Sequence, residues 1–339
     1  MRKVALFISL IIACIVILVL AMGIGSVPIA PIDCINIIIK KLFDIELFGA
    51  VNEISQSILL KIRIPRTLLA FVSGSGLAVS GVMMQSVLRN PLASSFTLGV
   101  SSGAALGASV AILFGISIFG FLTLPIFGLT AGLITVFLAL GVAAKVDRNL
   151  QNNSIILTGM AFSLFANAAI TIIMALSKEQ LQRLVYWQMG SFATKTPSEL
   201  MVLFPIIFIG CAISLRCARQ MDIMTLGDEQ AQTSGVEVKK MKWILLSLSA
   251  VITGSVVSLV GIIGFVDLFT PHAARKLFGA SHKYVIPASV LLGGAFMVLC
   301  DLIARTIVAP LELPVGAITS AIGAPFFIYL YFSRRKKAK

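Results

Sequence analysis

The chain has 339 residues, of which 58% are hydrophobic and only 12% are charged, against roughly 45–50% and about 25% in soluble domains. This composition, with a mean hydropathy of +1.02, excludes a water-soluble globule and predicts many membrane spans, since one span needs only about 20 apolar residues. The formal net charge of +13 is explained by Lys and Arg in loops on the cytoplasmic side of a membrane, and it does not indicate nucleic-acid binding.

Apolar segments long enough to cross a membrane follow one another along the whole chain. They fall near residues 4–27, 66–86, 97–118, 121–144, 154–176, 200–219, 243–262, 284–308 and 315–332. A further segment, 262–282, contains Asp267, Pro271 and His272, which indicates a short or broken helix buried in protein. The sequence therefore predicts an all-α integral membrane protein with about ten transmembrane helices in one domain, 1–339.

The distribution of basic residues predicts the orientation. With the N-terminus inside, about two-thirds of the 27 Lys and Arg fall on the same side, which is expected of the cytoplasmic face. Both termini are then cytoplasmic. A concentrated external group, Lys61, Arg63 and Arg66, runs against this rule and needs another explanation.

Two hydrophilic segments separate the predicted spans. Residues 28–62 mix apolar and acidic residues, which predicts an external amphipathic segment. Residues 217–242 carry acidic residues and lysines around Gly227 and Gly235, which predicts a cytoplasmic loop of two short helices at a hinge. The second segment is large enough for a partner protein to grip.

Small residues one helical turn apart recur in two predicted spans. The glycines are Gly99, Gly103 and Gly107 in one, and Gly128 and Gly132 in the other. Such ridges let helix backbones approach closely. We interpret them as packing surfaces and not as a functional site.

Sequence signatures of catalysis are absent. The chain has no phosphate-binding loop, no His-Glu-x-x-His and no Gly-x-Ser-x-Gly. Neither catalytic nor metal-ligating residues are predicted. An ion-coupled secondary transporter needs ionisable groups inside the membrane, and only Asp267 and Asp301 qualify. Asp301 precedes Arg305 by four residues and is expected to pair with it on one helix face, so this carrier stays an alternative hypothesis.

Several motifs occur in order from about residue 60 to the C-terminus. They are RIPRTLLA from residue 63, SGVMMQ from 80, RNPLA from 89, LGVSSGA from 98, WQMGS from 187, LGDE from 226, GFV from 264, PH at 271, ELPVG from 312 and IGAPFF from 322. Together they resemble the FecCD-type permeases, the membrane subunits of ATP-binding-cassette (ABC) importers for ferric siderophores, haem and vitamin B12.

The resemblance implies a vitamin B12 importer-like permease fold in a bacterial or archaeal inner or plasma membrane. It implies three kinds of partner: a second permease, identical or a sister subunit; two copies of a cytoplasmic ABC ATPase; and an external substrate-binding protein. The chain itself is expected to be no enzyme and to hold no cofactor, because ATP and Mg belong to the ATPase. Its expected activity is ATP-driven alternating access for a ferric siderophore or a related metal chelate, such as haem or cobalamin.

Site residues carried over from the family fall into three groups. Arg63, Arg66 and Arg305 match outer positions that dock carboxylates of the binding protein, for which Arg offers a charge-assisted grip. Residues of the 217–242 segment match the loop that couples to the ATPase, and Asn90, Pro91 and Leu92 match the inner translocation gate. The coupling residues are Gly227, Asp228, Glu229, Ala231 and Gly235.

Asp267 departs from the family pattern, which usually has a small residue there. A carboxylate inside a membrane is costly unless it is paired or hydrated. We therefore expect Asp267 to lie near an aqueous surface or to pair with a basic group, with Arg275 two turns further along as the candidate.

Overall fold

The computed structural model describes residues 2–25, 27–44, 52–176 and 179–337, and these residues form helices and connecting loops without a strand. The elements in chain order are α1 (Arg2–Gly23), α2 (Pro31–Phe43), α3 (Glu53–Ile58), the π-helical turn η1 (Leu59–Arg63), α4 (Ile64–Val87), η2 (Ser95–Leu98), α5 (Val100–Leu113), η3 (Gly120–Leu122), α6 (Thr123–Val146), α7 (Asn152–Leu176), α8 (Leu181–Gln188), α9 (Pro197–Arg216), α10 (Ala218–Met224), α11 (Asp228–Thr233), α12 (Val238–Val260), α13 (Val266–Phe278), α14 (His282–Thr306) and α15 (Val315–Lys337).

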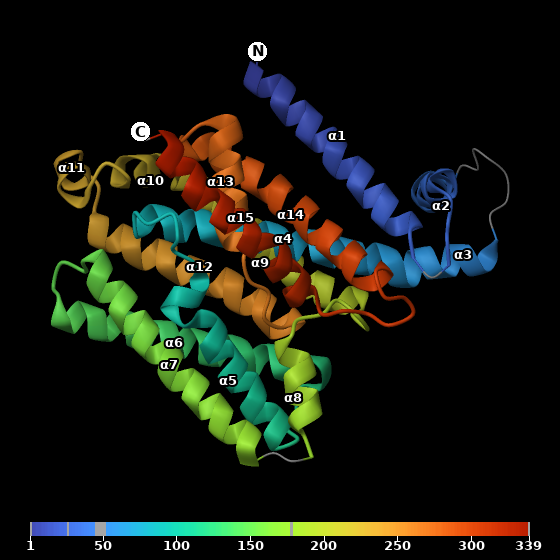
Figure 1. Cartoon of the computed structure of the whole chain (residues 1–339), viewed down its shortest axis with the longest axis horizontal. Coiled ribbons are helices and arrows are strands. Elements are labelled where there is room, and N and C mark those ends of the chain that lie inside the picture. The colour runs from blue at the N-terminus through green and yellow to red at the C-terminus, as the bar shows by residue number, and fades with distance from the viewer. Residues whose placement is uncertain (1, 26, 45–51, 177–178, 338–339) are drawn as a thin grey trace.

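The long helices form one bundle with short helices at both ends (Figure 1). The helices α10 and α11 lie at one end, and α2 and α3 lie at the opposite end. The helix α4 runs between these two ends through the middle of the bundle. A single helix therefore connects the two hydrophilic parts of the chain.

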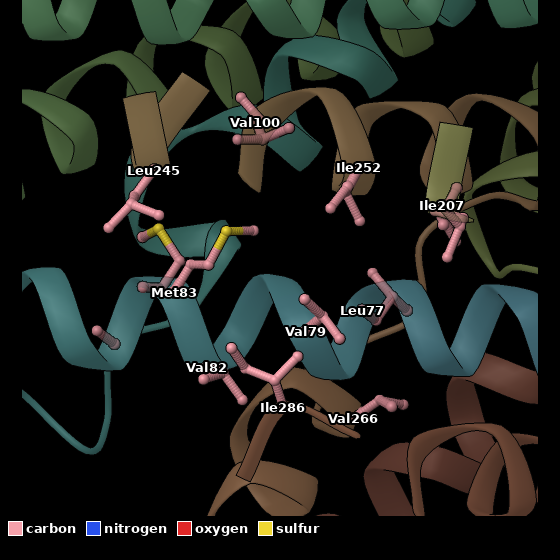
Figure 2. Packing of buried hydrophobic residues seen from close by; sticks show 14 of the residues in the cluster. Leu77, Val79, Val82, Met83, Val100, Ile207, Leu245, Ile252, Val266 and Ile286 are labelled. Carbon is pink, nitrogen blue, oxygen red and sulfur yellow. The ribbon is translucent and has the colours of Figure 1, made fainter. Parts of the chain in front are cut away.

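The helix α4 is the buried centre of the bundle. It contacts α14, α12, α9 and α13, and nearly all of its residues are buried. Leu77, Val79, Val82 and Met83 pack against side chains from these surrounding helices (Figure 2). Glycines allow the closest approaches, since a Cβ on Gly74 would lie 2.2 Å from the carbonyl oxygen of Gly293 in α14.

The predicted glycine ridges pack α5 against α6. A Cβ on Gly107 would lie 2.2 Å from the backbone oxygen of Phe127, and one on Gly132 would lie 3.0 Å from that of Val100. Side chains at these positions would hold the two backbones apart. The interpretation of these ridges as packing surfaces is confirmed.

Among the residues that the structure describes, seven helices are long and apolar enough to cross a membrane: Lys3–Gly23, Glu53–Val87, Gly120–Val146, Asn152–Leu176, Pro197–Arg216, Val238–Val260 and His282–Thr306. The other predicted spans coincide with α5, α13 and α15. The helix α5 is shorter than predicted because η2 and the left-handed Gly99 (φ 80°) precede it and a turn containing the left-handed Gly115 (φ 59°) follows it. The interrupted segment 262–282 contains only the 13-residue helix α13, as its broken pattern predicted.

The two hydrophilic segments also form helices. The segment 28–62 contains α2 and α3, and its residues 45–51 lie outside the described residues. The segment 217–242, called the coupling segment below, contains the two predicted short helices α10 and α11. Gly227 (φ 136°) directly precedes α11 and Gly235 (φ 82°) follows it, so glycine provides the backbone conformations that side chains disfavour.

Candidate functional site

Arg66 lies in the first turn of α4 and holds two carboxylates. Its Nη2 is 2.8 Å from Asp301 Oδ1, and its Nη1 is 2.8 Å from Glu312 Oε1. Its Nε also donates to both Asp301 oxygens at 3.1 Å. Since the side chains of Arg66 and Asp301 are 10% and 3% exposed, this is a buried pair with the bidentate geometry that stabilises arginine and carboxylate.

Two further arginines join this group from neighbouring elements. Arg63 donates to the backbone oxygens of Met22 and Gly23, at 2.9 and 2.7 Å. Arg305 in α14 donates to the backbone oxygen of Ala21. The arginine cluster, defined as Arg63, Arg66 and Arg305, therefore ties the end of α1 to α4 and α14.

The pairing predicted for Asp301 was incomplete. Arg305 Nε lies 3.8 Å from Asp301 Oδ2, while Arg66 from another helix lies 2.8 Å away. A pair four residues apart was visible in the sequence, whereas the stronger partner is 235 residues distant. Arg66 and Arg305 therefore share Asp301, and Arg66 also holds Glu312, whose side chain is 37% exposed.

A buried lysine at the end of the coupling segment fixes α11 to the bundle. Lys242 in α12 has a side chain without exposure; its Nζ is 2.7 Å from Asp228 Oδ2 and donates to the backbone oxygen of Leu150 at 2.8 Å. The other oxygen of Asp228 lies 3.6 Å from Arg89 Nη2. Asp228 thus points toward the bundle and connects α11 with α12 and with the loop after α4.

A second inward carboxylate holds α10. Asp222 Oδ1 lies 2.5 Å from Nδ1 of His282, the first residue of α14, and His282 Nε2 lies 2.5 Å from Ser86 Oγ in α4. This order of groups matches that of a hydrolase triad, but Ser86 is 2% exposed and donates to the backbone oxygen of Val82. The arrangement therefore ties α10, α14 and α4 together and offers no accessible nucleophile.

The other coupling residues differ in solvent exposure. Glu229 is exposed, whereas Ala231 is buried. A polar groove of about 930 Å³ runs beside them between α11 and the loops after α4 and α6. Its lining includes Arg89, Asn149, Gly227, Asp228 and Glu229. This groove is a concave polar surface beside the exposed Glu229.

The predicted gate residues form a tight turn just after α4. Arg89 adopts a left-handed conformation (φ 49°). Asn90 Oδ1 then accepts from the Leu92 backbone N–H at 2.9 Å, and its backbone oxygen accepts from the Ala93 N–H at 3.0 Å. The Leu92 side chain is 55% exposed. The turn presents this apolar side chain away from the bundle.

The expectation for Asp267 was wrong in both of its forms. Asp267 is only 2% exposed, so it does not lie at an aqueous surface. Its Oδ2 accepts from the Ser95 backbone N–H at 3.0 Å, while Arg275 donates to Gln85 instead. The partner is a backbone amide in η2, which no pattern of charged residues indicates.

Sequence reasoning did not identify the residues that hold the predicted site residues in position. These partners of the predicted residues, or of their neighbours, are Lys242, Asp222, His282 and Gln85. A lysine at the start of an otherwise apolar span and a histidine beginning the next long span were visible signals. Their partners lie in other elements, so the pairings themselves were not predictable.

Residues 12–333 match the FecCD transport family, which decides the identification. The chain belongs to this family. It is 36% identical to the hemin transport system permease protein HmuU of Yersinia pestis, covering 84% of this chain and 86% of that protein. It is 37% identical to the cobalamin import system permease protein BtuC of Halobacterium salinarum, covering 86% and 77%.

The fold agrees with this assignment. A solved structure described as an inward-facing conformation of a metal-chelate type ABC transporter matches with a TM-score of 0.83 at 29% identity, covering 97% of this chain and 99% of that one. The chain is therefore a multi-pass membrane permease of the metal-chelate type ABC importer family. Members of this family are not themselves enzymes.

Proposed function

We propose that this FecCD-family chain is the membrane subunit of a binding-protein-dependent ABC importer that carries a ferric siderophore or a related metal chelate, such as haem or cobalamin, into the cytoplasm. The proposal rests on the arrangement of the candidate site residues at the two ends of the central helix α4. The arginine cluster lies at the start of α4, and the gate turn and coupling segment lie at its end. Movement at one end therefore has a rigid path to the other.

Orientation follows from charge. The coupling segment and the gate turn lie in the cytoplasm, as do both termini, and the arginine cluster lies outside. The partners are two copies of an ABC ATPase, an external substrate-binding protein and a second permease. ATP and Mg are held by the ATPase, and this chain holds no cofactor of its own.

The ATPase engages the coupling segment through its exposed residues. The exposed Glu229 provides fit and orientation. Ala231, Gly227 and Gly235 shape the helix pair instead of contacting the partner through long side chains. Asn90, Pro91 and Leu92 form the gate at the inner end of the pathway.

The binding protein docks at the arginine cluster, where its carboxylates replace partners that the arginines have within the chain. Within the chain, Arg66 is occupied by Asp301 and Glu312, and Arg63 is occupied by backbone oxygens. Glu312 is the exposed member of the group. A carboxylate of the binding protein replaces Glu312 on Arg66, so that docking exchanges one charge-assisted pair for another.

Uptake measurements in a strain lacking this chain test the function. Labelled ferric siderophores, haem and cobalamin are supplied separately, with and without the restored gene. Loss of uptake for at least one chelate, restored by the gene, is expected. Normal uptake of every chelate would refute the substrate class, and uptake abolished by collapsing the proton gradient at constant ATP would favour the ion-coupled carrier.

A further inference from the structure

The gate residues lie within a short segment that is held at both ends by carboxylates from other elements. We define the gate segment as residues 89–95, from the left-handed Arg89 after α4 to Ser95 at the start of η2. Between these residues the Asn90 turn supplies local hydrogen bonds. Contacts outside the turn fix where this segment lies; besides the two carboxylates, the Ser95 hydroxyl bonds to Ser80 of α4 at 2.7 Å and accepts from Thr253 of α12 at 2.9 Å.

The far end of the gate segment is attached to α13. The Ser95 backbone N–H donates to Asp267 Oδ2 at 3.0 Å, and both residues are buried. The backbone oxygen of Asp267 in turn accepts from Gln85 Nε2 at 3.2 Å. This end is therefore fixed to α13 and, through Gln85, to α4.

The near end is attached to the coupling segment. Arg89 Nη2 lies 3.6 Å from Asp228 Oδ1, while Asp228 Oδ2 is held by the fully buried Lys242 at 2.7 Å. Lys242 thus fixes the orientation of a carboxylate that also reaches Arg89. Because α11 begins at Asp228, a displacement of α11 acts on the first residue of the gate segment directly.

From this geometry we propose that Arg89 and Asp228 are positioning residues that transmit movement of the coupling segment to the gate, with Asp267 as the fixed point at the far end. The proposal rests on the function proposed above. Asp228 points into the permease and connects α11 to the gate segment. The neighbouring Glu229 is exposed and contacts the ATPase. The coupling between hydrolysis and gate movement then depends on one ion pair.

The critical variant is Arg89→Gln. The Arg89 side chain is 40% exposed, and its removal leaves Asp228 paired with Lys242, so no buried charge is orphaned. Arg89→Lys keeps the charge. Arg148→Gln is the matched control, since it removes one exposed positive charge from the loop between α6 and α7.

The readout is chelate taken up per ATP hydrolysed, measured with the assembled complex in proteoliposomes. For Arg89→Gln we expect normal assembly and continued ATP hydrolysis, but uptake per ATP lower by about fivefold or more, as expected for loss of a coupling interaction. Arg89→Lys restores most of the ratio, and Arg148→Gln leaves it unchanged. A purely structural role would lower hydrolysis and uptake together.

Two results overturn the inference. One is an uptake ratio for Arg89→Gln equal to that of Arg148→Gln, and the other is an Arg89→Gln complex that fails to assemble. If the unmodified complex hydrolyses no ATP or takes up no chelate, the proposed function is refuted, and the inference falls with it.

Discussion

Gly81 marks the place where α13 crosses the central helix α4. A Cβ at this position would lie 1.9 Å from the backbone oxygen of Asp267 and 2.8 Å from its Cα. Because a helix backbone cannot rotate away as a side chain does, Gly81→Ala moves α13 by about 1.5 Å to reach ordinary van der Waals contact. The hydrogen bond from Gln85 Nε2 to Asp267 O, now 3.2 Å, is then lost.

We expect Gly81→Ala to destabilise the protein by about 2–4 kcal/mol, combining overpacking with the lost hydrogen bond. The assay is thermal unfolding of the purified protein in detergent, followed by monodispersity on size exclusion. Gly141→Ala is the matched control, since a Cβ there meets nothing within 4 Å and alanine favours the helix. Equal melting temperatures for Gly81→Ala and the wild type would refute the crossing geometry described here.

Two further predictions concern buried carboxylates. Arg66→Met destabilises the protein by about 3–5 kcal/mol because Asp301 loses its main partner, and adding Asp301→Leu recovers part of the loss. A thermal-unfolding cycle in which the two losses simply add would contradict the buried pair. Asp267→Ala costs about 1–3 kcal/mol by leaving the Ser95 N–H without an acceptor, whereas Asp267→Asn retains an acceptor. Equal melting temperatures for these two Asp267 variants would contradict the contact with Ser95.

Much of the fold followed from the sequence because a membrane imposes a simple rule. Each long apolar segment becomes a helix when the backbone has no water to bond with, and the seven long apolar helices within the described part of the chain were all anticipated. The length of α5 was overestimated, because hydropathy does not report the left-handed Gly99 before this helix and Gly115 after it. The break before α13 was anticipated, since Asp267 and Pro271 interrupt the pattern.

Motifs in the sequence picked out candidate site residues, whose roles stay predictions, but did not indicate their contacts. They gave no sign, for example, that Arg66 pairs with Asp301 across 235 residues. Asp267 illustrates the reason. We expected the Asp267 carboxylate to be hydrated or to pair with a basic side chain. Instead it accepts a hydrogen bond from the Ser95 backbone N–H at the start of η2. Such partners depend on how loops pass each other in space.

The central claim is that this chain works as the membrane subunit of an ABC importer. Gentle affinity purification from native membranes, with mass spectrometry of the co-purifying proteins, tests it most directly. We expect an ATPase with a phosphate-binding loop to co-purify with the chain. When Glu229 is replaced by Arg, we expect the yield of this ATPase to fall. Repeated recovery of the chain without any ATPase would contradict the account and favour the ion-coupled carrier.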